Sequence, residues 1–306
     1  MDWYVELDKR LAEELPDLKV VCDEPMSRHT SFRIGGPARR MAYPTSREQL
    51  VELMEIAVEC GARPFVIGKG TNLLITDEGL DRLVIDTSEV NRIELGTEPF
   101  VLIADAGVSL ARLADFACKQ GMAGLEFAHG IPGTVGGAIC MNAGAYDGEM
   151  KLVVEQVSVY FPGEGVREIA GADMDFSYRH SLLSSHPEAV VLSAVFRLKA
   201  GDPETIRERM RELMARRKAS QPLEFPSAGS TFKRPTGYFA GTLIEQNGLK
   251  GLTVGGAQVS EKHAGFLINV GGATFKDVTG LIEAVQERVF AATGVHLEPE
   301  VKIIHS

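Results

Sequence analysis

The stretch from residue 130 to residue 144, GIPGTVGGAICMNAG, constrains this chain more than any other segment. Five of its fifteen residues are glycine. Glycine lets the backbone adopt conformations that are closed to other residues and approach a ligand very closely. Successive amide N–H groups in such turns form concave sites for anions, which suits a diphosphate. The stretch therefore predicts either a pair of tight turns or a binding loop for an anionic group.

The length and the charge narrow the class of protein. A chain of 306 residues predicts two domains that can each bury a core. The 42 acidic and 32 basic residues give a net charge of −10, which argues against a broad nucleic-acid surface but permits a local basic pocket. The four cysteines lack a CxxC spacing, and the chain has neither a secretory signal nor an apolar run of about 20 residues. We expect a cytoplasmic protein with no membrane partner, and nothing requires more than a monomer.

Apolar spacing and capping residues outline the elements. Helices are predicted at residues 7–15, 45–61, 109–121, 202–221 and 274–294. Strands are predicted at residues 64–67, 73–75, 83–85, 101–104, 153–169 as a hairpin, 190–198, 266–268 and 295–304, the last with an interruption at 297–300. The predicted N-caps are Thr45, Ser109, Asp202 and Thr274. The order indicates an α+β fold rather than a regular βαβ alternation, with a boundary that separates domains 1–200 and 201–306.

A second glycine loop lies upstream, between two predicted strands. It consists of Gly68, Lys69, Gly70, Thr71 and Asn72. The loop does not fit the P-loop pattern or the dinucleotide-binding GxGxxG pattern, because the required residues and the following helix are missing. Its amides, hydroxyl and side-chain amide still suit a phosphate or a ribose. A structural turn is an equally good interpretation of this loop alone.

Three polar segments contain candidate reactive residues. Arg179 lies in a YRHS sequence, and a guanidinium binds a carboxylate or phosphate through paired hydrogen bonds. Ser230 lies close to Lys233 and Arg234, which could hold an anion beside the hydroxyl. Glu300 lies in an EPEV sequence near the C-terminus. The structural alternatives are a surface ion pair, a turn serine and a solvated strand-end charge. The seven histidines show no zinc spacing, so no metal site is predicted.

Taken together, these segments resemble the family of UDP-N-acetylenolpyruvoylglucosamine reductases. The resemblance extends from residue 30 to the C-terminus. The matching motifs are TSFRIGG at residues 30–36, GKGTNLL at 68–74, GIPGTVGG at 130–137, MNAGA at 141–145, YRHS at 178–181, AGSTFKRP at 228–235 and EPEV at 298–301. The continuous sequence at residues 260–269 is similar to the shorter type of the family, which lacks a substrate-covering tyrosine loop.

The resemblance implies a cofactor and a fold. It implies FAD, bound non-covalently in an FAD-binding domain of the vanillyl-alcohol-oxidase (PCMH) kind with two α+β subdomains, followed by a smaller α+β substrate-binding domain. His129, which precedes the central loop, is then expected to be structural or to line the site. The implied cofactor-binding residues are those of the two glycine loops: Gly68, Lys69, Gly70, Thr71, Asn72, Gly130, Ile131, Pro132, Gly133, Thr134, Gly136, Gly137, Asn142, Ala143 and Gly144.

The family's reaction is the NADPH-dependent reduction of UDP-N-acetylglucosamine enolpyruvate to UDP-N-acetylmuramate. This step supplies peptidoglycan precursors, and therefore cell-wall biogenesis, cell shape and cell division. By motif, Ser230 is the implied proton donor, while Arg179 and Glu300 stabilise the enol-like intermediate. A neutral serine is a weak acid, so Lys233 or a water is expected to assist it. Weaker candidates for binding the diphosphate or the carboxylate of the substrate are Lys233, Arg234, Lys262 and His263.

Two other functions fit parts of the pattern. A flavoenzyme of the same fold could oxidise an alcohol or hydroxy acid, but such a reaction needs no serine proton donor. A catalytically silent nucleotide-binding protein could keep only the fold, but binding alone does not require Arg179, Ser230 and Glu300 together. The enolpyruvyl reductase is therefore the preferred interpretation.

Overall fold

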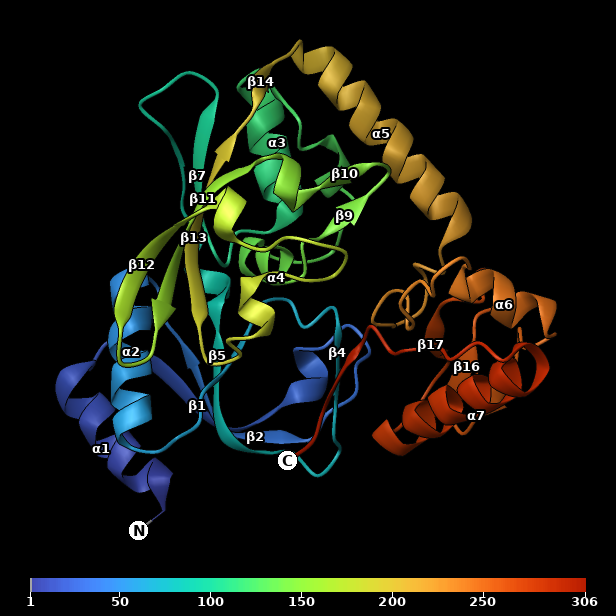
Figure 1. Cartoon of the computed structure of the whole chain (residues 1–306). Coiled ribbons are helices and arrows are strands. Elements are labelled where there is room, and N and C mark those ends of the chain that lie inside the picture. Colours follow the sequence, from blue (N-terminus) through green and yellow to red (C-terminus); the bar gives the residue numbers. More distant parts are fainter. Residues whose placement is uncertain (1) are drawn as a thin grey trace. The chain divides into compact units, whose positions relative to one another are not determined.

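A computed structural model describes residues 2–306, which form two compact units (Figure 1). The first unit contains the described residues up to 22 with residues 40–69 and 82–215. The second contains residues 23–39, 70–81 and 216–306. The units therefore alternate along the chain. The boundary predicted at residues 200–201 lies within the part of the first unit that ends at residue 215, and the division into domains 1–200 and 201–306 stays a prediction.

The helices and strands agree broadly with the predicted ones. The α-helices are α1 (Trp3–Glu14), α2 (Arg47–Glu59), α3 (Leu110–Lys119), α4 (Val135–Cys140), α5 (Pro203–Ser220), α6 (Ala240–Gln246) and α7 (Phe275–Thr293). The first nine strands are β1 (Lys19–Pro25), β2 (Pro37–Tyr43), β3 (Phe65–Ile67), β4 (Leu73–Ile75), β5 (Leu80–Asp86), β6 (Ile93–Leu95), β7 (Val101–Asp105), β8 (Met122–Ala123) and β9 (Gly144–Ala145). The remaining strands are β10 (Gly148–Glu149), β11 (Val154–Phe161), β12 (Gly165–Ala170), β13 (Val190–Arg197), β14 (Lys199–Ala200), β15 (Thr253–Val254), β16 (Ala257–Val259), β17 (Leu267–Asn269) and β18 (Lys302–Ile304).

A five-stranded antiparallel sheet forms the centre of the first unit, in the order β12-β11-β13-β7-β6. The predicted hairpin is the pair β11 and β12, and β13 pairs on the other side of β11 (Figure 1). Helix α4 packs against β13 and β7. The core here includes Leu102, Leu113, Val157 and Phe196, all fully buried. This packing places the glycine-rich stretch directly on the sheet.

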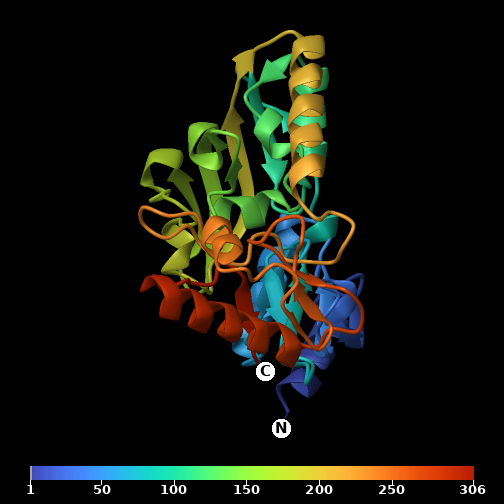
Figure 2. The ribbon, with the colours of Figure 1, turned by 90° about the vertical axis from the view of Figure 1, so that its right-hand side faces the viewer.

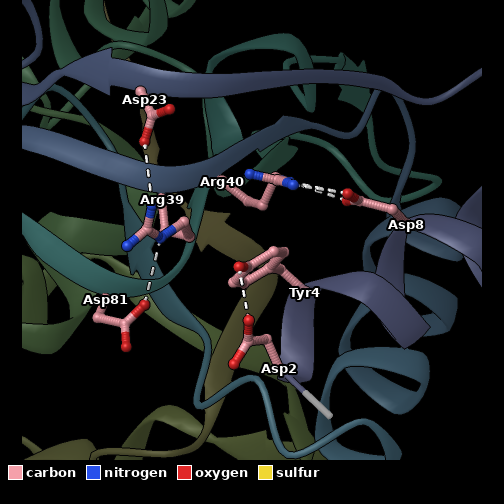
Figure 3. Close-up of polar contacts among 7 residues, drawn as sticks. All are labelled: Asp2, Tyr4, Asp8, Asp23, Arg39, Arg40 and Asp81. Atoms are coloured by element: carbon pink, nitrogen blue, oxygen red, sulfur yellow. Dashed lines mark hydrogen bonds and ion pairs between the residues drawn. The ribbon is translucent and has the colours of Figure 1, made fainter.

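Helix α1 packs on α2 at another part of the first unit. Leu7 and Leu11 of α1 are buried in one core with Leu50 and Leu53 of α2. The guanidinium of Arg40 also donates two-pronged hydrogen bonds to the Asp8 carboxylate, with nitrogen–oxygen distances of 2.7 and 2.9 Å (Figure 3). Such a bidentate pair fixes the direction of the helix as well as its place.

The start of α2 corrects a prediction. Its N-cap is Ser46, whose Oγ accepts a hydrogen bond from the Gln49 amide, and not Thr45. The Gln49 side chain accepts in turn from the Thr45 backbone N–H at 2.8 Å. The predicted N-caps Ser109, Asp202 and Thr274 are confirmed, because each side chain accepts a hydrogen bond from the amide three residues on.

The second unit contains the three-stranded sheet β15-β16-β17, and α7 packs against β15 and β16 (Figure 2). Strand β18 pairs in parallel with β4. The strand at residues 295–304 was predicted with an interruption at 297–300, and β18 covers only the part after that interruption. Within the interruption Pro299, which lacks an amide N–H, forms an isolated bridge with Phe232. In the same unit Arg39 lies between Asp23 and Asp81, at 3.7 and 3.4 Å (Figure 3).

Several elements escaped sequence analysis, among them β1, β2, α4, α6 and the short strands β6, β8, β9, β10, β14, β15 and β16. Helix α4 contains Gly136 and Gly137, so turns were predicted there. Glycine is a poor helix former, and only packing against the sheet stabilises this short helix. Strands β1 and β2 carry charged residues such as Asp23, Arg39 and Arg40, which weaken the alternating apolar pattern.

The start of α7 generates a prediction about stability. Thr274 and Asp277 form a reciprocal capping box, and the backbone N–H of Thr274 holds the pKa of the Asp277 carboxyl below its usual range. Because Thr274→Ala leaves the Asp277 amide without its acceptor, we expect the free energy of unfolding to fall by about 1 kcal/mol. Urea unfolding followed by circular dichroism measures this. Thr274→Ser keeps the hydroxyl and is the control, and equal losses in both variants would contradict the assignment.

Candidate active site

The central glycine stretch is anchored in the first unit by backbone hydrogen bonds. The amides of Val135 and Gly136 donate to the carbonyls of Val108 and Ala106, both at 2.8 Å. The Leu110 amide donates to the Gly133 carbonyl at 3.2 Å. The stretch is therefore held against residues 106–110, where β7 connects to α3. Backbone hydrogen bonds, rather than side-chain contacts, fix its path.

The two glycine loops meet within this unit, at Gly68 and Thr134. A Cβ placed on Gly68 would lie 2.2 Å from the Thr134 Oγ1, closer than any real contact. A Cβ on Gly136 would lie 3.1 Å from the Ala106 Cβ. Sequence analysis treated the loops as separate candidates for one ligand. The structure brings their nearest residues together, with glycine required for the close approach.

Free amides remain in this loop pair. Among residues 2–306, the backbone N–H groups of Gly133 and Thr134 have no hydrogen-bond acceptor, although Thr134 is only 2% exposed. Buried backbone donors are nearly always paired in native proteins. Gly137 is exposed, and a Cβ there would meet only the Thr134 Oγ1, at 3.7 Å. The donor set and the open space therefore fit an anionic group such as a diphosphate.

The rest of the first loop enters the second unit at Gly70. Its backbone is left-handed, with φ +56°, and a Cβ there would lie 2.0 Å from the His29 carbonyl oxygen. Asn72 donates through Nδ2 to the Glu300 carbonyl at 3.1 Å, and the Lys302 amide donates to the Asn72 carbonyl at 3.0 Å. Asn72 thus joins the predicted cofactor loop to the predicted catalytic Glu300 segment.

Asn142 acts as a support within the first unit. It is 1% exposed and has a left-handed φ of +40°. Its Nδ2 donates to the Glu149 carboxylate and the Ser177 carbonyl, and its Oδ1 accepts from the Lys151 amide. Both side-chain N–H groups are therefore used within the protein. Asn142 fixes the backbone that leads to Ala143 and Gly144.

Arg179 lies at the tip of a two-residue hairpin. Ser177 and His180 exchange backbone hydrogen bonds at 3.2 Å, and Arg179 between them has a left-handed φ of +55°. The buried hydroxyl of Ser181 donates to the Cys140 carbonyl at 3.0 Å, at the end of α4. Together with the Asn142 bond, this ties the Arg179 hairpin to the glycine stretch. A strained residue held by its surroundings often marks a functional position.

The second unit brings Ser230 and Glu300 onto adjacent chain segments. Ser230 bridges Phe266, and the amide of Thr231 donates to the Gly265 carbonyl at 2.8 Å. The carbonyl of Thr231 accepts from the Glu300 amide at 2.7 Å. The Ser230 hydroxyl is partly buried and donates to the Phe232 carbonyl at 3.3 Å. Sequence analysis did not select Thr231, because Thr231 contributes through backbone hydrogen bonds, which its residue type does not indicate.

The four candidate substrate-binding residues have different surroundings. Lys233 forms an ion pair with Glu298, so its charge is already balanced. The Lys262 ammonium donates to the Lys218 carbonyl at 2.8 Å, at the end of α5. The Arg234 guanidinium lies 4.4 Å from the centre of the exposed Phe239 ring.

His263 is the fourth candidate, and its Nδ1 accepts from the Gly265 amide at 3.1 Å. His129 lies in the first unit, and its buried Nδ1 has no hydrogen-bond partner among the described residues. Groups of three or more side chains able to hold a metal ion are absent from residues 2–306. No helix in this part of the chain is long and apolar enough to cross a membrane.

Comparisons with known proteins decide the family. Residues 38–169 match the model of an FAD binding domain, and residues 221–304 match the C-terminal domain of UDP-N-acetylenolpyruvoylglucosamine reductase. The reductase of that name from Caldanaerobacter subterraneus is 50% identical over 296 residues, which cover 96% of this chain and 97% of the relative. The one from Clostridioides difficile is 45% identical, with 99% and 98% covered.

The chain belongs to the UDP-N-acetylenolpyruvoylglucosamine reductase family. A crystal structure of the reductase from Thermus caldophilus is similar, with a TM-score of 0.79 at 36% identity, covering 94% of this chain and 98% of that one. These matches confirm the predicted family and the α+β fold with an FAD-binding domain of the PCMH kind. The FAD binding domain precedes the reductase C-terminal domain, in the order expected.

The strained backbone at Arg179 yields a matched comparison. Arg179→Ala and Arg179→Gly both remove the guanidinium, but only glycine adopts a left-handed φ without strain. We expect Arg179→Gly to be more stable than Arg179→Ala by about 1 kcal/mol. Urea unfolding of the two variants measures the difference. Equal stabilities would show that the hairpin does not hold residue 179 in this conformation.

Proposed function

We infer that this protein is an FAD-dependent reductase that uses NADPH to reduce UDP-N-acetylglucosamine enolpyruvate to UDP-N-acetylmuramate. The observation that carries the inference is the near-full-length similarity to reductases of that name, at up to 50% identity among those compared. The product is a precursor of peptidoglycan. We also propose that the enzyme is cytoplasmic and monomeric, and that it serves cell-wall biogenesis, cell shape and cell division.

The glycine loops are the proposed cofactor site. The unpaired amides of Gly133 and Thr134 would bind the diphosphate of FAD, with the neighbouring residues 68–72, 130–137 and 142–144 lining the cofactor. When bound, FAD supplies hydride transfer, taking electrons from NADPH and delivering them to the enolpyruvyl double bond. Because FAD is expected to bind non-covalently, we propose that His129 lines the cofactor site and is not attached to FAD.

Three side chains are the proposed catalytic groups. Ser230 donates a proton to the carbon next to the substrate carboxylate, where negative charge develops. Arg179 stabilises that charge with its guanidinium cation, whose backbone the hairpin holds in one conformation. Glu300 lies beside the Ser230 segment through the Thr231 backbone and belongs to the same proton network. Because Lys233 is paired with Glu298, we expect a water rather than Lys233 to assist proton donation by Ser230.

The substrate anions are the proposed targets of the remaining cations. Arg234 and Lys262 belong to the second unit with the Ser230 loop, and they would attract the diphosphate. Lys233 is the weaker candidate, because the Glu298 carboxylate already balances its charge. The rival alcohol or hydroxy-acid oxidase makes a different prediction about colour. The purified protein should be yellow, bleach anaerobically with NADPH, and recover its colour with the enolpyruvyl nucleotide but not with lactate or an alcohol.

The contact between Gly68 and Thr134 tests the cofactor site. Gly68→Ala places a methyl group against the Thr134 Oγ1, so we expect the purified variant to lose most of its FAD. Thr134→Ala removes that oxygen, and the double variant should regain FAD relative to Gly68→Ala. Flavin absorbance per protein measures both. Failure of the second change to restore any flavin would contradict the steric explanation.

Ser230 has a separate test that divides the reaction into halves. In Ser230→Ala, bleaching by NADPH should keep its normal rate, because that half needs no proton donor at the substrate. Reoxidation by the enolpyruvyl nucleotide should slow by about 10²–10⁴-fold. Stopped-flow absorbance of the flavin measures each half. Ser220→Ala, at the exposed end of α5, is the control, and normal reoxidation in Ser230→Ala would remove the donor role.

A further inference from the structure

A short 3-10 helix, η2 (Thr87–Glu89), follows β5 in the first unit. The parallel pairing of β5 with β3 ends at Asp86 and Ile67. Directly after this pair come Thr87 on one side and Gly68, the first residue of the upstream glycine loop, on the other. Helix η2 therefore begins beside the start of that loop.

The side chain of Thr87 holds the entry to the upstream loop. Its hydroxyl donates to the Ile67 carbonyl at 3.0 Å. Thr87 and Ile67 are both only 3% exposed, so water does not replace this bond if the hydroxyl is removed. The Ile67 carbonyl belongs to the peptide group that joins Ile67 to Gly68, and the Thr87 hydroxyl therefore fixes the orientation of that peptide.

The orientation of this peptide also sets the direction of the Gly68 amide. In a planar trans peptide the C=O and the following N–H point in opposite directions. Among residues 2–306, the Gly68 N–H has no hydrogen-bond acceptor. The bond that holds the Ile67 carbonyl thus aims an unpaired N–H away from Thr87, at the residue that lies against Thr134.

The backbone of η2 contacts the segment that supports the central glycine stretch. The Val90 amide donates to the Thr87 carbonyl, and the Gly107 amide donates to the Val90 carbonyl, both at 2.9 Å. A Cβ on Gly107 would lie 1.7 Å from the Thr87 carbonyl oxygen, so the two backbones are in direct contact. Gly107 lies between Ala106 and Val108, whose carbonyls accept the hydrogen bonds of the central stretch. Thr87 therefore contacts the supports of both glycine loops.

Neighbouring side chains fix η2 itself. The Asp86 carboxylate accepts from the Ser88 amide at 2.8 Å and caps the helix. The Asn91 side-chain amide donates to the Ser88 carbonyl at 2.7 Å. The Arg112 guanidinium of α3 donates in turn to the Asn91 carbonyl, also at 2.7 Å. These bonds hold Thr87 in one place, from which its hydroxyl reaches the Ile67 carbonyl.

We propose that Thr87 is a positioning residue of the cofactor site. Its hydroxyl orients the peptide between Ile67 and Gly68, so that the Gly68 N–H becomes a donor to the diphosphate of FAD. This donor adds to the unpaired amides of Gly133 and Thr134 in the loop that Gly68 contacts. Thr87 acts through Gly68 and does not itself touch the cofactor. The role rests on the proposed function, because it requires FAD to be the ligand of the two glycine loops.

Two substitutions separate the hydroxyl of Thr87 from its methyl group. Thr87→Val keeps the shape of the side chain but removes the donor, whereas Thr87→Ser keeps the donor and removes the methyl. We expect Thr87→Val to raise the Kd for FAD about tenfold and Thr87→Ser to stay within about twofold of the parent. Dilution of each holoenzyme, followed by the fluorescence of released FAD, measures these constants.

A second readout separates positioning from support of the fold. FAD that binds only the folded protein raises the free energy of unfolding by an amount that depends on its concentration relative to Kd. Added FAD should therefore stabilise Thr87→Val against urea less than it stabilises the parent. A residue that only supports the fold would lower the stability with and without added FAD by the same amount.

Thr279→Val is the matched control in α7 of the second unit. The Thr279 hydroxyl also donates to a backbone carbonyl, that of Phe275, at 3.1 Å. Its loss should leave the Kd for FAD and the stabilisation by added FAD at the parent values.

The outcomes for Thr87 and for the cofactor are distinguishable. Equal affinities for FAD in Thr87→Val and Thr87→Ser, changed or unchanged, would overturn the role of the hydroxyl. If Thr87→Val does not fold, Thr87→Ala replaces it, since alanine and serine at this position differ only by the hydroxyl. A parent protein that binds no FAD would instead overturn the proposed function.

Discussion

The backbone of Thr231 is the constraint on which the second unit's site depends. Its N–H donates to the Gly265 carbonyl and its C=O accepts from the Glu300 amide, at 2.8 and 2.7 Å. Its buried hydroxyl accepts from the Leu267 amide at 3.2 Å. Thr231 thus joins its own segment to two others that are far apart in sequence, one at residues 265–267 and one at Glu300. Ser230, His263 and Glu300 owe their common neighbourhood to these bonds, and a buried backbone group that lost its partner would destabilise all three segments together.

In the first unit, distant segments come together because glycine has no side chain. Gly68 approaches Thr134 so closely that a Cβ could not fit, and the Ser181 hydroxyl then ties the Arg179 hairpin to the end of α4. Asn142 adds a second tie to Ser177. The amides of Val135 and Gly136 donate to the carbonyls of Val108 and Ala106, whereas those of Gly133 and Thr134 have no acceptor among residues 2–306. The unit therefore keeps free donors in a place where the backbone cannot easily move.

Local strain accompanies these positions. Asn142 and Arg179 both have left-handed backbones without being glycine, and each lies in a motif that sequence analysis selected. Such conformations cost about 1 kcal/mol or more and persist only when surrounding bonds outweigh the cost. For Asn142 those bonds are three side-chain hydrogen bonds, and for Arg179 they are the paired backbone bonds of its hairpin. With its left-handed φ, the backbone at Arg179 turns within the hairpin between Ser177 and His180 instead of continuing as a strand.

The sequence by itself determined the family, the cofactor and the α+β class, because motif spacing and glycine content are local properties. The residues that carry the chemistry stay a prediction from those motifs. Three of its four predicted helix caps were right for the same reason, and the error at Thr45 was one residue. Only the tertiary structure decided that Gly68 meets Thr134, that Lys233 is neutralised by Glu298, and that α4 is a helix despite its glycines. The lowered pKa of His263 also came from the fold, since burial is its main cause. These features depend on contacts between distant segments and on loss of water, which no local pattern encodes.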